Sequence, residues 1–253
     1  MSIQRTEAII LKTIPFGETS KILTTFTKNM GKVNLLAKGA RDVKSKYGGS
    51  LELFNYISVI YYDRTERDLQ YVSDVSVIDP FLQIHNDLDR TYEALAIIEM
   101  CNRLILGNED NLHLFDLLVQ TLQGIDRAEK RPVNGLLYFM LHVATRLGFT
   151  MDFESCKNCR DVMDHKELNF SVEHGRVVCE SCPAHLRNVS GALLSKESLG
   201  IMRQIARSHG NGIYNIAMSE KACNEVYQLL LRHLQYHMEE LQNLNSLSFL
   251  KLA

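Results

Sequence analysis

The sequence predicts an α+β protein, in which a small N-terminal β-barrel precedes an α-helical domain that carries an inserted four-cysteine ribbon. Three observations support this fold class. Short β-branched runs punctuated by glycine fill about the first 80 residues, apolar residues then recur at helical spacing, and two C-x-x-C pairs interrupt that helical pattern. With 253 residues, the chain is long enough for two or three domains of ordinary size.

The N-terminal domain is predicted over residues 1–80. Its strand signals lie at residues 7–13, 21–27, 32–37, 55–62 and 69–77, and glycines between them mark turns, at Gly17, Gly31, Gly39 and the pair Gly48 and Gly49. Five short strands in about 80 residues fit an OB-fold barrel, which predicts a nucleic-acid-binding domain. The strand pattern leaves an SH3-like barrel open as an alternative.

Residues 81–253 are predicted to form a helical bundle domain. After Pro80, apolar residues recur at three- and four-residue spacing in five segments, near residues 94–105, 114–125, 137–147, 195–208 and 219–241. Pro132 precedes the third segment, where the first turn of a helix tolerates proline, and Gly148 follows that segment as a stop signal. Ser195 is the expected N-cap of the fourth segment. We expect helices from both sides of the cysteines to pack into one bundle.

Four of the six cysteines lie in an insertion predicted at about residues 153–187, as the pairs Cys156/Cys159 and Cys179/Cys182. The 19 residues between Cys159 and Cys179 fit the spacing of a structural zinc site. Two residues within each pair allow a tight turn to aim both sulfurs at one tetrahedral ion. Alternating apolar residues at 168–172, a turn at 173–175 and the run 176–178 predict a β-hairpin that delivers the second pair beside the first.

The cysteines therefore predict one structural Zn²⁺. Four thiolates leave no open coordination position, so a catalytic metal is disfavoured. A redox-active dithiol and an unoccupied site stay open as alternatives, although the redox motif normally lies in a βαβ unit that this region lacks. Cys101 and Cys223 lie on the apolar sides of helices and are expected to be inert core residues.

The strongest electrostatic feature is residues 28–49, where six cations face the single acid Asp42 in a chain whose net charge is −2. Exposed lysines and arginines on a loop can neutralise phosphates without reading sequence. Our candidates for DNA contacts are Lys38, Arg41, Lys44 and Lys46, with Lys32 and Lys12 as weaker ones. Such a run of lysines is also typical of an ordinary solvated loop, so charge alone leaves both interpretations open.

Several aromatic residues of the same domain could stack on bases. They are Phe26, Tyr47, Phe54, Tyr56, Tyr61 and Tyr62. The alternative is that most of these rings face the barrel core. Gly39, at the start of the basic loop, would allow a ligand to approach the backbone closely.

Composition and motifs exclude several classes of function. No apolar run reaches the 18 or more residues of a membrane span or the shorter core of a secretory signal, so we expect a cytoplasmic protein with reduced thiols. The sequence contains no P-loop, no G-x-S-x-G and no H-E-x-x-H motif. We therefore expect a binding protein and not an enzyme.

The segment PFGETSKILTTFTKNMGKVNLLAKGAR, at residues 15–41, resembles the amino-terminal signature of the RecO family of bacterial recombination mediators. Gly17-Glu18, the Gly31 turn, residues 35–41, Ser45 and residues 51–54 all fit that signature, and the likeness continues to about residue 245. The resemblance implies an OB-fold followed by a helical domain with a zinc-binding insertion. The four cysteine positions match those of the zinc-bearing members, whereas other members lack them.

The resemblance also implies a function in recombinational DNA repair, without cofactor turnover, in the cytoplasm and at the nucleoid. RecO-like proteins bind single- and double-stranded DNA, anneal complementary strands, join RecR, contact the acidic C-terminal tail of the single-stranded DNA-binding protein and help to load RecA. Arg203, Arg207 and Arg232 are possible edges of a groove for that tail. The alternative function is a zinc-ribbon RNA-binding or transcription-associated module, which would prefer RNA.

Overall fold

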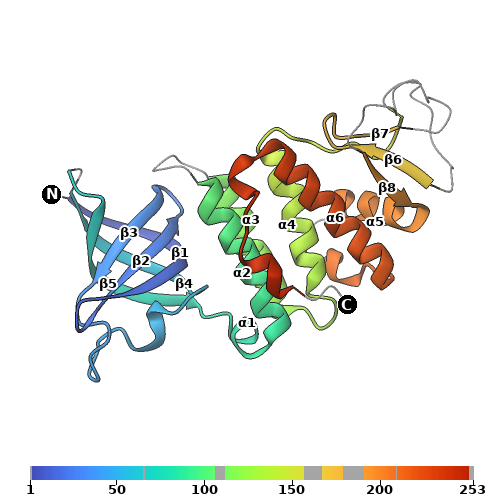
Figure 1. The fold of residues 1–253 in the computed structure, drawn as a ribbon. Helices are drawn as coiled ribbons and strands as arrows, with labels where there is room; N and C mark the ends of the chain where they lie inside the picture. Colours follow the sequence, from blue (N-terminus) through green and yellow to red (C-terminus); the bar gives the residue numbers. More distant parts are fainter. Residues whose placement is uncertain are drawn as a thin grey trace. The chain divides into compact units, whose positions relative to one another are not determined.

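The structure is a computed structural model, which describes residues 2–64, 66–105, 112–156, 167–178, 191–208 and 210–250. The chain divides into two compact units, Met1–Asp126 and Arg127–Ala253 (Figure 1). Strands form the beginning of the first unit, and helices dominate the rest of the described chain. The mixed α+β fold, with an N-terminal barrel followed by helices, is confirmed.

The first unit begins with a closed five-stranded barrel. Its strands are β1 (Ser2–Phe16), β2 (Ser20–Thr27), β3 (Gly31–Ala37), β4 (Tyr56–Asp63) and β5 (Leu69–Asp79). They follow the order β1-β2-β3-β5-β4, in which β1 closes the barrel on β4 and only the β3–β5 pair is parallel. Each predicted strand is present, and the five-stranded closed barrel matches the OB-type prediction.

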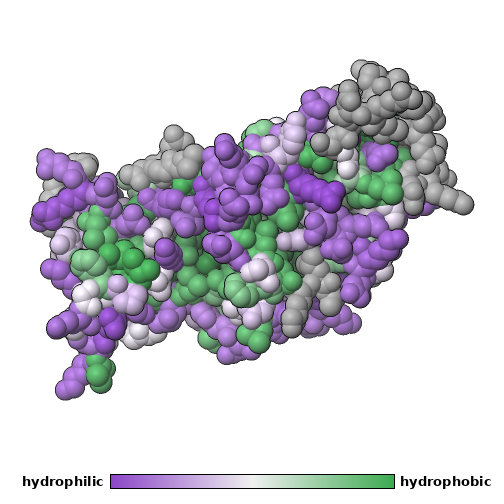
Figure 2. Space-filling model, viewed as in Figure 1, coloured by the Kyte–Doolittle hydropathy of each residue, from purple (hydrophilic) through white to green (hydrophobic). Residues whose placement is uncertain are grey.

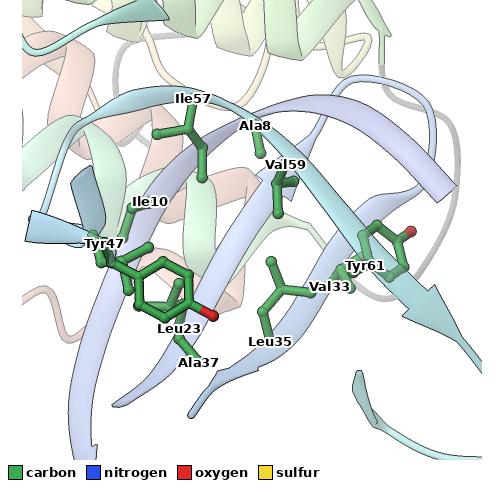
Figure 3. Close-up of a cluster of buried hydrophobic side chains, with 11 residues drawn as sticks. Ala8, Ile10, Leu23, Val33, Leu35, Ala37, Tyr47, Ile57, Val59 and Tyr61 are labelled. Atoms are coloured by element: carbon green, nitrogen blue, oxygen red, sulfur yellow. The ribbon is translucent and has the colours of Figure 1, made fainter. Parts of the chain in front are cut away.

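The barrel is filled by one side of each strand, because successive side chains point to opposite faces. Figure 3 shows the inward-facing residues, including Leu23 from β2, Leu35 from β3 and Val59 from β4. A short 3-10 turn, η1 (Gly48–Leu51), adds Leu51 to this core, and the residue before it adds Tyr47. Tyr47 and Leu51 therefore fix the C-terminal end of the cation-rich residues 28–49 to the barrel core.

Three helices complete the first unit: α1 (Leu82–Asn86), α2 (Leu88–Leu104) and α3 (Leu112–Arg127). Asp87 caps α2, because its side chain accepts hydrogen bonds from the backbone nitrogens of Asp89 and Arg90. Phe115 of α3 packs edge-on against Phe26 of the barrel, with ring centroids 5.4 Å apart. The predicted boundary at residue 80 marks the end of the strands, whereas the compact unit continues to Asp126 because these helices pack on the barrel.

The second unit is built on α4 (Val133–Arg146), α5 (Lys196–Arg207) and α6 (Glu220–His237). These helices contact one another, as expected for a bundle assembled from both sides of the cysteines. Ser195 caps α5 as predicted, by accepting a hydrogen bond from the Ser198 nitrogen. The last predicted helix is shorter than expected, because Met238 adopts an extended backbone and Leu241 lies in a separate 3-10 turn, η4 (Glu239–Leu241). No helix in the described ranges is both long and apolar enough to cross a membrane.

The second unit also contains further 3-10 turns and one small sheet. The turns are η3 (Gly210–Asn215) and η5 (Ser246–Phe249). The sheet has the order β7-β6-β8, from β6 (Glu167–Ser171), β7 (Arg176–Val178) and β8 (Gly191–Ser195). The antiparallel β6–β7 hairpin is the one predicted from the alternation around Phe170. Strand β8 was not predicted, although Ala192 and Leu194 are buried and their neighbours Gly191 and Leu193 are exposed, a period-two pattern.

Candidate nucleic-acid interface

The basic loop, residues 38–47, leaves the end of β3 and is held against the β1–β2 turn. The Arg41 nitrogen donates to the Thr19 carbonyl at 2.7 Å, and the Arg41 guanidinium donates to the Gly17 carbonyl at 3.3 Å. Gly39 has a φ of +68°, and a Cβ there would lie 3.0 Å from the Asp42 carboxylate. The glycine is thus required by the turn itself, which explains it without close approach of a ligand.

Four cations of this loop are exposed and lie close together in the chain: Lys38, Arg41, Lys44 and Lys46. The Lys38 ammonium lies 4.8 Å from the ring centroid of Tyr71, and the Lys46 ammonium donates to the Ser73 carbonyl of β5 at 2.6 Å. Within the described ranges, none of the four forms an ion pair with a carboxylate. Their positive charge therefore faces solvent uncompensated, as a phosphate-binding surface requires.

Two other cations of the barrel, Lys28 and Lys21, are paired with carboxylates. Lys28 is paired with Glu7 at 2.9 Å, and hydrogen bonds from Tyr56 and Lys28 lower the pKa of Glu7. Lys21 is paired with Glu52 at 3.1 Å. Lys12, one of the weaker candidates, is exposed on β1, outside the loop. The charge of residues 28–49 counted from the sequence therefore overstates the positive charge available to a ligand, because Lys28 is already paired with Glu7.

Lys32 is turned toward α2. Its ammonium donates to the carbonyl of Asn102, in the last turn of that helix, at 2.7 Å. A cation is favourable there because the last carbonyls of a helix carry partial negative charge. Burial lowers the pKa of Lys32. Lys32, one of the weaker predicted DNA contacts, therefore joins the barrel to α2 through its ammonium.

The stacking prediction is wrong for four of the six aromatic residues. These four side chains lie in the protein interior and are 6% exposed or less. They are Phe26, Tyr47, Phe54 and Tyr61. The Tyr56 hydroxyl donates to Glu7 at 2.6 Å, and its ring lies against Phe115. Only Tyr62 of the six is left partly exposed on a strand without such a partner in the described structure.

The first predicted metal ligand, Cys156, is buried, with 1% of its surface exposed. Cys159, Cys179 and Cys182 lie outside the described residues, and the ranges that are described contain no cluster of three metal-ligating side chains. Asp152 forms a parallel bridge with Arg176, and the Asp152 nitrogen donates to the Gly175 carbonyl at 2.7 Å. The segment that leads to Cys156 and the strand that ends one residue before Cys179 therefore run side by side in the same direction.

Two arginines of α5 brace that first segment. Arg203 donates to the Phe153 carbonyl at 3.0 Å, and Arg207 is paired with Glu154 at 2.6 Å. Both are candidate edges of a groove for an acidic tail, but their charge is directed to the base of the cysteine insertion. Arg232, the third candidate, is exposed on α6.

His233 fixes α6 to the same region. This residue is 1% exposed, and its two ring nitrogens lie 3.1 Å from the Val172 carbonyl and 3.0 Å from the Phe149 carbonyl. Burial lowers the pKa of His233, and the neighbouring His237 acts in the same direction, while the two carbonyls oppose them. No sequence signal distinguished His233 from any other histidine on a helix.

Comparison with known proteins places the two parts of the chain in one family. Residues 1–81 match the family model described as Recombination protein O N terminal, and residues 85–247 match the one described as Recombination protein O C terminal. The DNA repair protein RecO of Chloroherpeton thalassium is 28% identical over 246 residues, which cover 94% of each chain. The DNA repair protein RecO of Thermodesulfovibrio yellowstonii is 30% identical over 232 residues, which cover 90% of this chain and 91% of its own.

Proposed function

The chain belongs to the RecO family of DNA repair proteins, and from this premise we propose that it is a recombination mediator that binds DNA through the exposed cations of the basic loop. It would bind single- and double-stranded DNA, anneal complementary strands and help to load RecA on strands coated with single-stranded DNA-binding protein. One observation supports this most strongly. Lys38, Arg41, Lys44 and Lys46 are exposed together and have no carboxylate partner in the described structure.

The geometry suits annealing because annealing needs no bond chemistry. Two phosphate backbones approach each other only when cations screen their repulsion, and the bases must exchange fast enough to find their partners. A set of lysines and one arginine on a loop can contact phosphates in many arrangements, independently of sequence. We expect no catalytic step of the protein's own.

The experiment is a salt titration of binding to a single-stranded oligonucleotide. The double variant Lys38→Gln plus Arg41→Gln removes two predicted phosphate contacts, so the slope of log affinity against log salt should fall by about 0.7 for each phosphate that is no longer neutralised. A matched control, Lys21→Gln plus Lys28→Gln, removes the same charge from cations already paired with Glu52 and Glu7. That control should leave the slope close to wild type.

Unchanged DNA binding by the loop variant would contradict the proposal. If the loop variant binds as tightly as wild type at low salt, these residues do not contact DNA and the proposal fails. An RNA oligonucleotide of equal length is titrated beside the DNA. A marked preference for RNA would support the alternative of an RNA-binding or transcription-associated module.

We also propose that one structural Zn²⁺ is held by Cys156, Cys159, Cys179 and Cys182. The parallel bridge between Asp152 and Arg176 supports this. It places side by side the two segments that lead, in the same direction, to the first and second C-x-x-C pairs. The ion would have a structural role, because tetrahedral coordination by four sulfurs would hold the two C-x-x-C pairs together. Metal analysis should find about one zinc per chain, and thiol reagents should react fully only after chelation. A metal-free protein with the same melting behaviour would refute the proposal.

The protein partners that we propose are RecR and the acidic C-terminal tail of the single-stranded DNA-binding protein, with RecA affected indirectly. Because Arg203 and Arg207 are engaged at the cysteine insertion, Arg232 is the better candidate of the three for a tail contact. Binding of a fluorescent acidic peptide to the Arg232→Ala variant tests this, and unchanged affinity would remove Arg232 from the proposal.

A further inference from the structure

A continuous row of apolar and aromatic side chains crosses all five strands of the barrel. The strand register makes each member the direct partner of the next, starting on one stretch of β1 and returning to another stretch of β1. We name it the outer row, and its members in order are Ile14, Ile22, Leu36, Tyr71, Tyr62 and Ile3. Directly opposite residues on neighbouring antiparallel strands have Cβ atoms about 5 Å apart, so Tyr71 and Tyr62 lie side by side on the outer face.

The outer row faces away from the barrel core. Its members alternate with core residues along each strand: Leu23 follows Ile22, Leu35 precedes Leu36, and Tyr61 precedes Tyr62. Ile14 and Ile3 are 41% and 68% exposed at the two ends, Ile22, Tyr71 and Tyr62 are partly exposed, and Leu36 between them is buried. Figure 2 shows a hydrophobic area on the barrel at the position of β2 and β3.

The basic loop borders the centre of this row. Lys38 lies two residues after Leu36, on the same outer side, and its ammonium is 4.8 Å from the ring centroid of Tyr71. Lys46 reaches the carbonyl of Ser73, two residues after Tyr71. Aromatic rings and uncompensated cations are thus adjacent, which is the combination that single-stranded nucleic acid requires.

We propose that Tyr71 and Tyr62 form a base-stacking platform for single-stranded DNA, with Lys38 and Lys46 holding the phosphates beside it. This inference rests on the proposed function and names the part of the site that recognises unpaired strands. A duplex offers its phosphates to the loop but keeps its bases stacked inside, so only a single strand can use the two rings. When a base occupies Tyr71, the Lys38 ammonium moves from the ring to the phosphate.

Charge complementarity favours DNA over a protein partner as the occupant. The row lies beside the exposed Lys38 and Lys46, and the described residues place no carboxylate in an ion pair with either. An uncharged protein surface would leave those cations without partners. An acidic peptide is the remaining competitor, and the experiment separates it from DNA.

The experiment compares Tyr71→Ala and Tyr62→Ala with wild type on a single-stranded oligonucleotide, on a duplex and on an abasic strand of equal length. Loss of one stacked base weakens single-strand binding by about 5- to 150-fold. Duplex and abasic binding should change less than about twofold, because neither presents a base to the ring. Tyr71→Phe should restore single-strand binding. Tyr236→Ala is the matched control, since that tyrosine is 53% exposed on α6 of the other unit.

Each outcome decides the proposal. Equal losses on single strand, duplex and abasic strand mean that Tyr71 only positions the loop, and the stacking platform is refuted. No loss on any ligand, while the Lys38 and Arg41 double variant loses binding, refutes stacking but leaves the proposed function standing. Wild type that binds no DNA refutes the proposed function itself. Loss of acidic-peptide binding in Tyr71→Ala with unchanged DNA binding would make the row a protein-docking surface.

Discussion

Substitution of Gly175 by alanine tests how closely the cysteine insertion is packed on the second unit. Gly175 lies in the turn between β6 and β7 with a φ of +62°, and a Cβ there would lie 2.6 Å from the Thr150 carbonyl oxygen. Gly210 is a matched control in the same unit, because its φ is +59° and a Cβ there would meet nothing within 4 Å. The two substitutions share the same backbone cost and differ in the steric clash.

The magnitude follows from these two contributions. A left-handed backbone costs a non-glycine residue about 1–2 kcal/mol, and both variants lose that amount. The clash adds about 1–3 kcal/mol for Gly175→Ala, as in overpacked cores. The Thr150 carbonyl cannot move away easily, because hydrogen bonds fix the chain on both sides of it. The Asp152 nitrogen donates to the Gly175 carbonyl, and the Phe149 carbonyl lies 3.0 Å from the ring of the buried His233. We therefore expect losses of about 2–5 kcal/mol for Gly175→Ala and about 1–2 kcal/mol for Gly210→Ala.

The assay is urea unfolding of the full-length protein, followed by circular dichroism, with the variants compared by their midpoints at unchanged slope. The salt slope of DNA binding serves as an internal check, because it reports the basic loop of the first unit and should stay unchanged in both variants. Equal destabilisation by the two substitutions would refute the reasoning, since it would show that the Thr150 carbonyl gives way without cost.

Two further predictions concern pH. Burial raises the pKa of Glu93 on α2 well above its ordinary value of 4.5. The free energy of unfolding should therefore fall as the pH rises from 4.5 through the raised pKa, because the folded protein keeps a proton that the unfolded chain has lost. The slope is at most about 1.4 kcal/mol per pH unit. Glu93→Gln should abolish this slope and be more stable than wild type at pH 8; parallel pH profiles would contradict it. Burial lowers the pKa of His233, so stability should be lost as pH falls from 6.5 through the lowered pKa, because the unfolded chain binds the proton first. His233→Gln should flatten that acid-side loss in urea titrations between pH 5 and pH 7, and an undiminished slope would assign the loss to other groups.

Local sequence signals predicted the elements of the fold that depend on neighbours in the chain. Alternation around Leu35 and Val59 predicted strands, the hydroxyl of Ser195 predicted a helix start, and the run at 168–178 predicted a hairpin. Each of these features follows from side chains within a few residues of one another. The exposed cations of the loop were likewise visible, because a run of lysines beside glycine has few ways to become buried.

Partners that are distant in the sequence escaped prediction. Lys28 and Lys32 look like Lys38 in the chain, yet Glu7 and the Asn102 carbonyl, 21 and 70 residues away, take up their charge. Tyr61 and Tyr62 are neighbours of the same chemical type, but a strand sends one into the core and the other outward.

By itself, the sequence determined the class of fold, the five strands of the barrel and the family. Only the tertiary structure decided which cations are left uncompensated, which rings are exposed, and that Tyr71 lies beside Tyr62 and Lys38. The physical reason is that periodicity and caps arise from local backbone geometry, whereas charge compensation and cross-strand neighbours depend on strand register and on helices that pack from far along the chain.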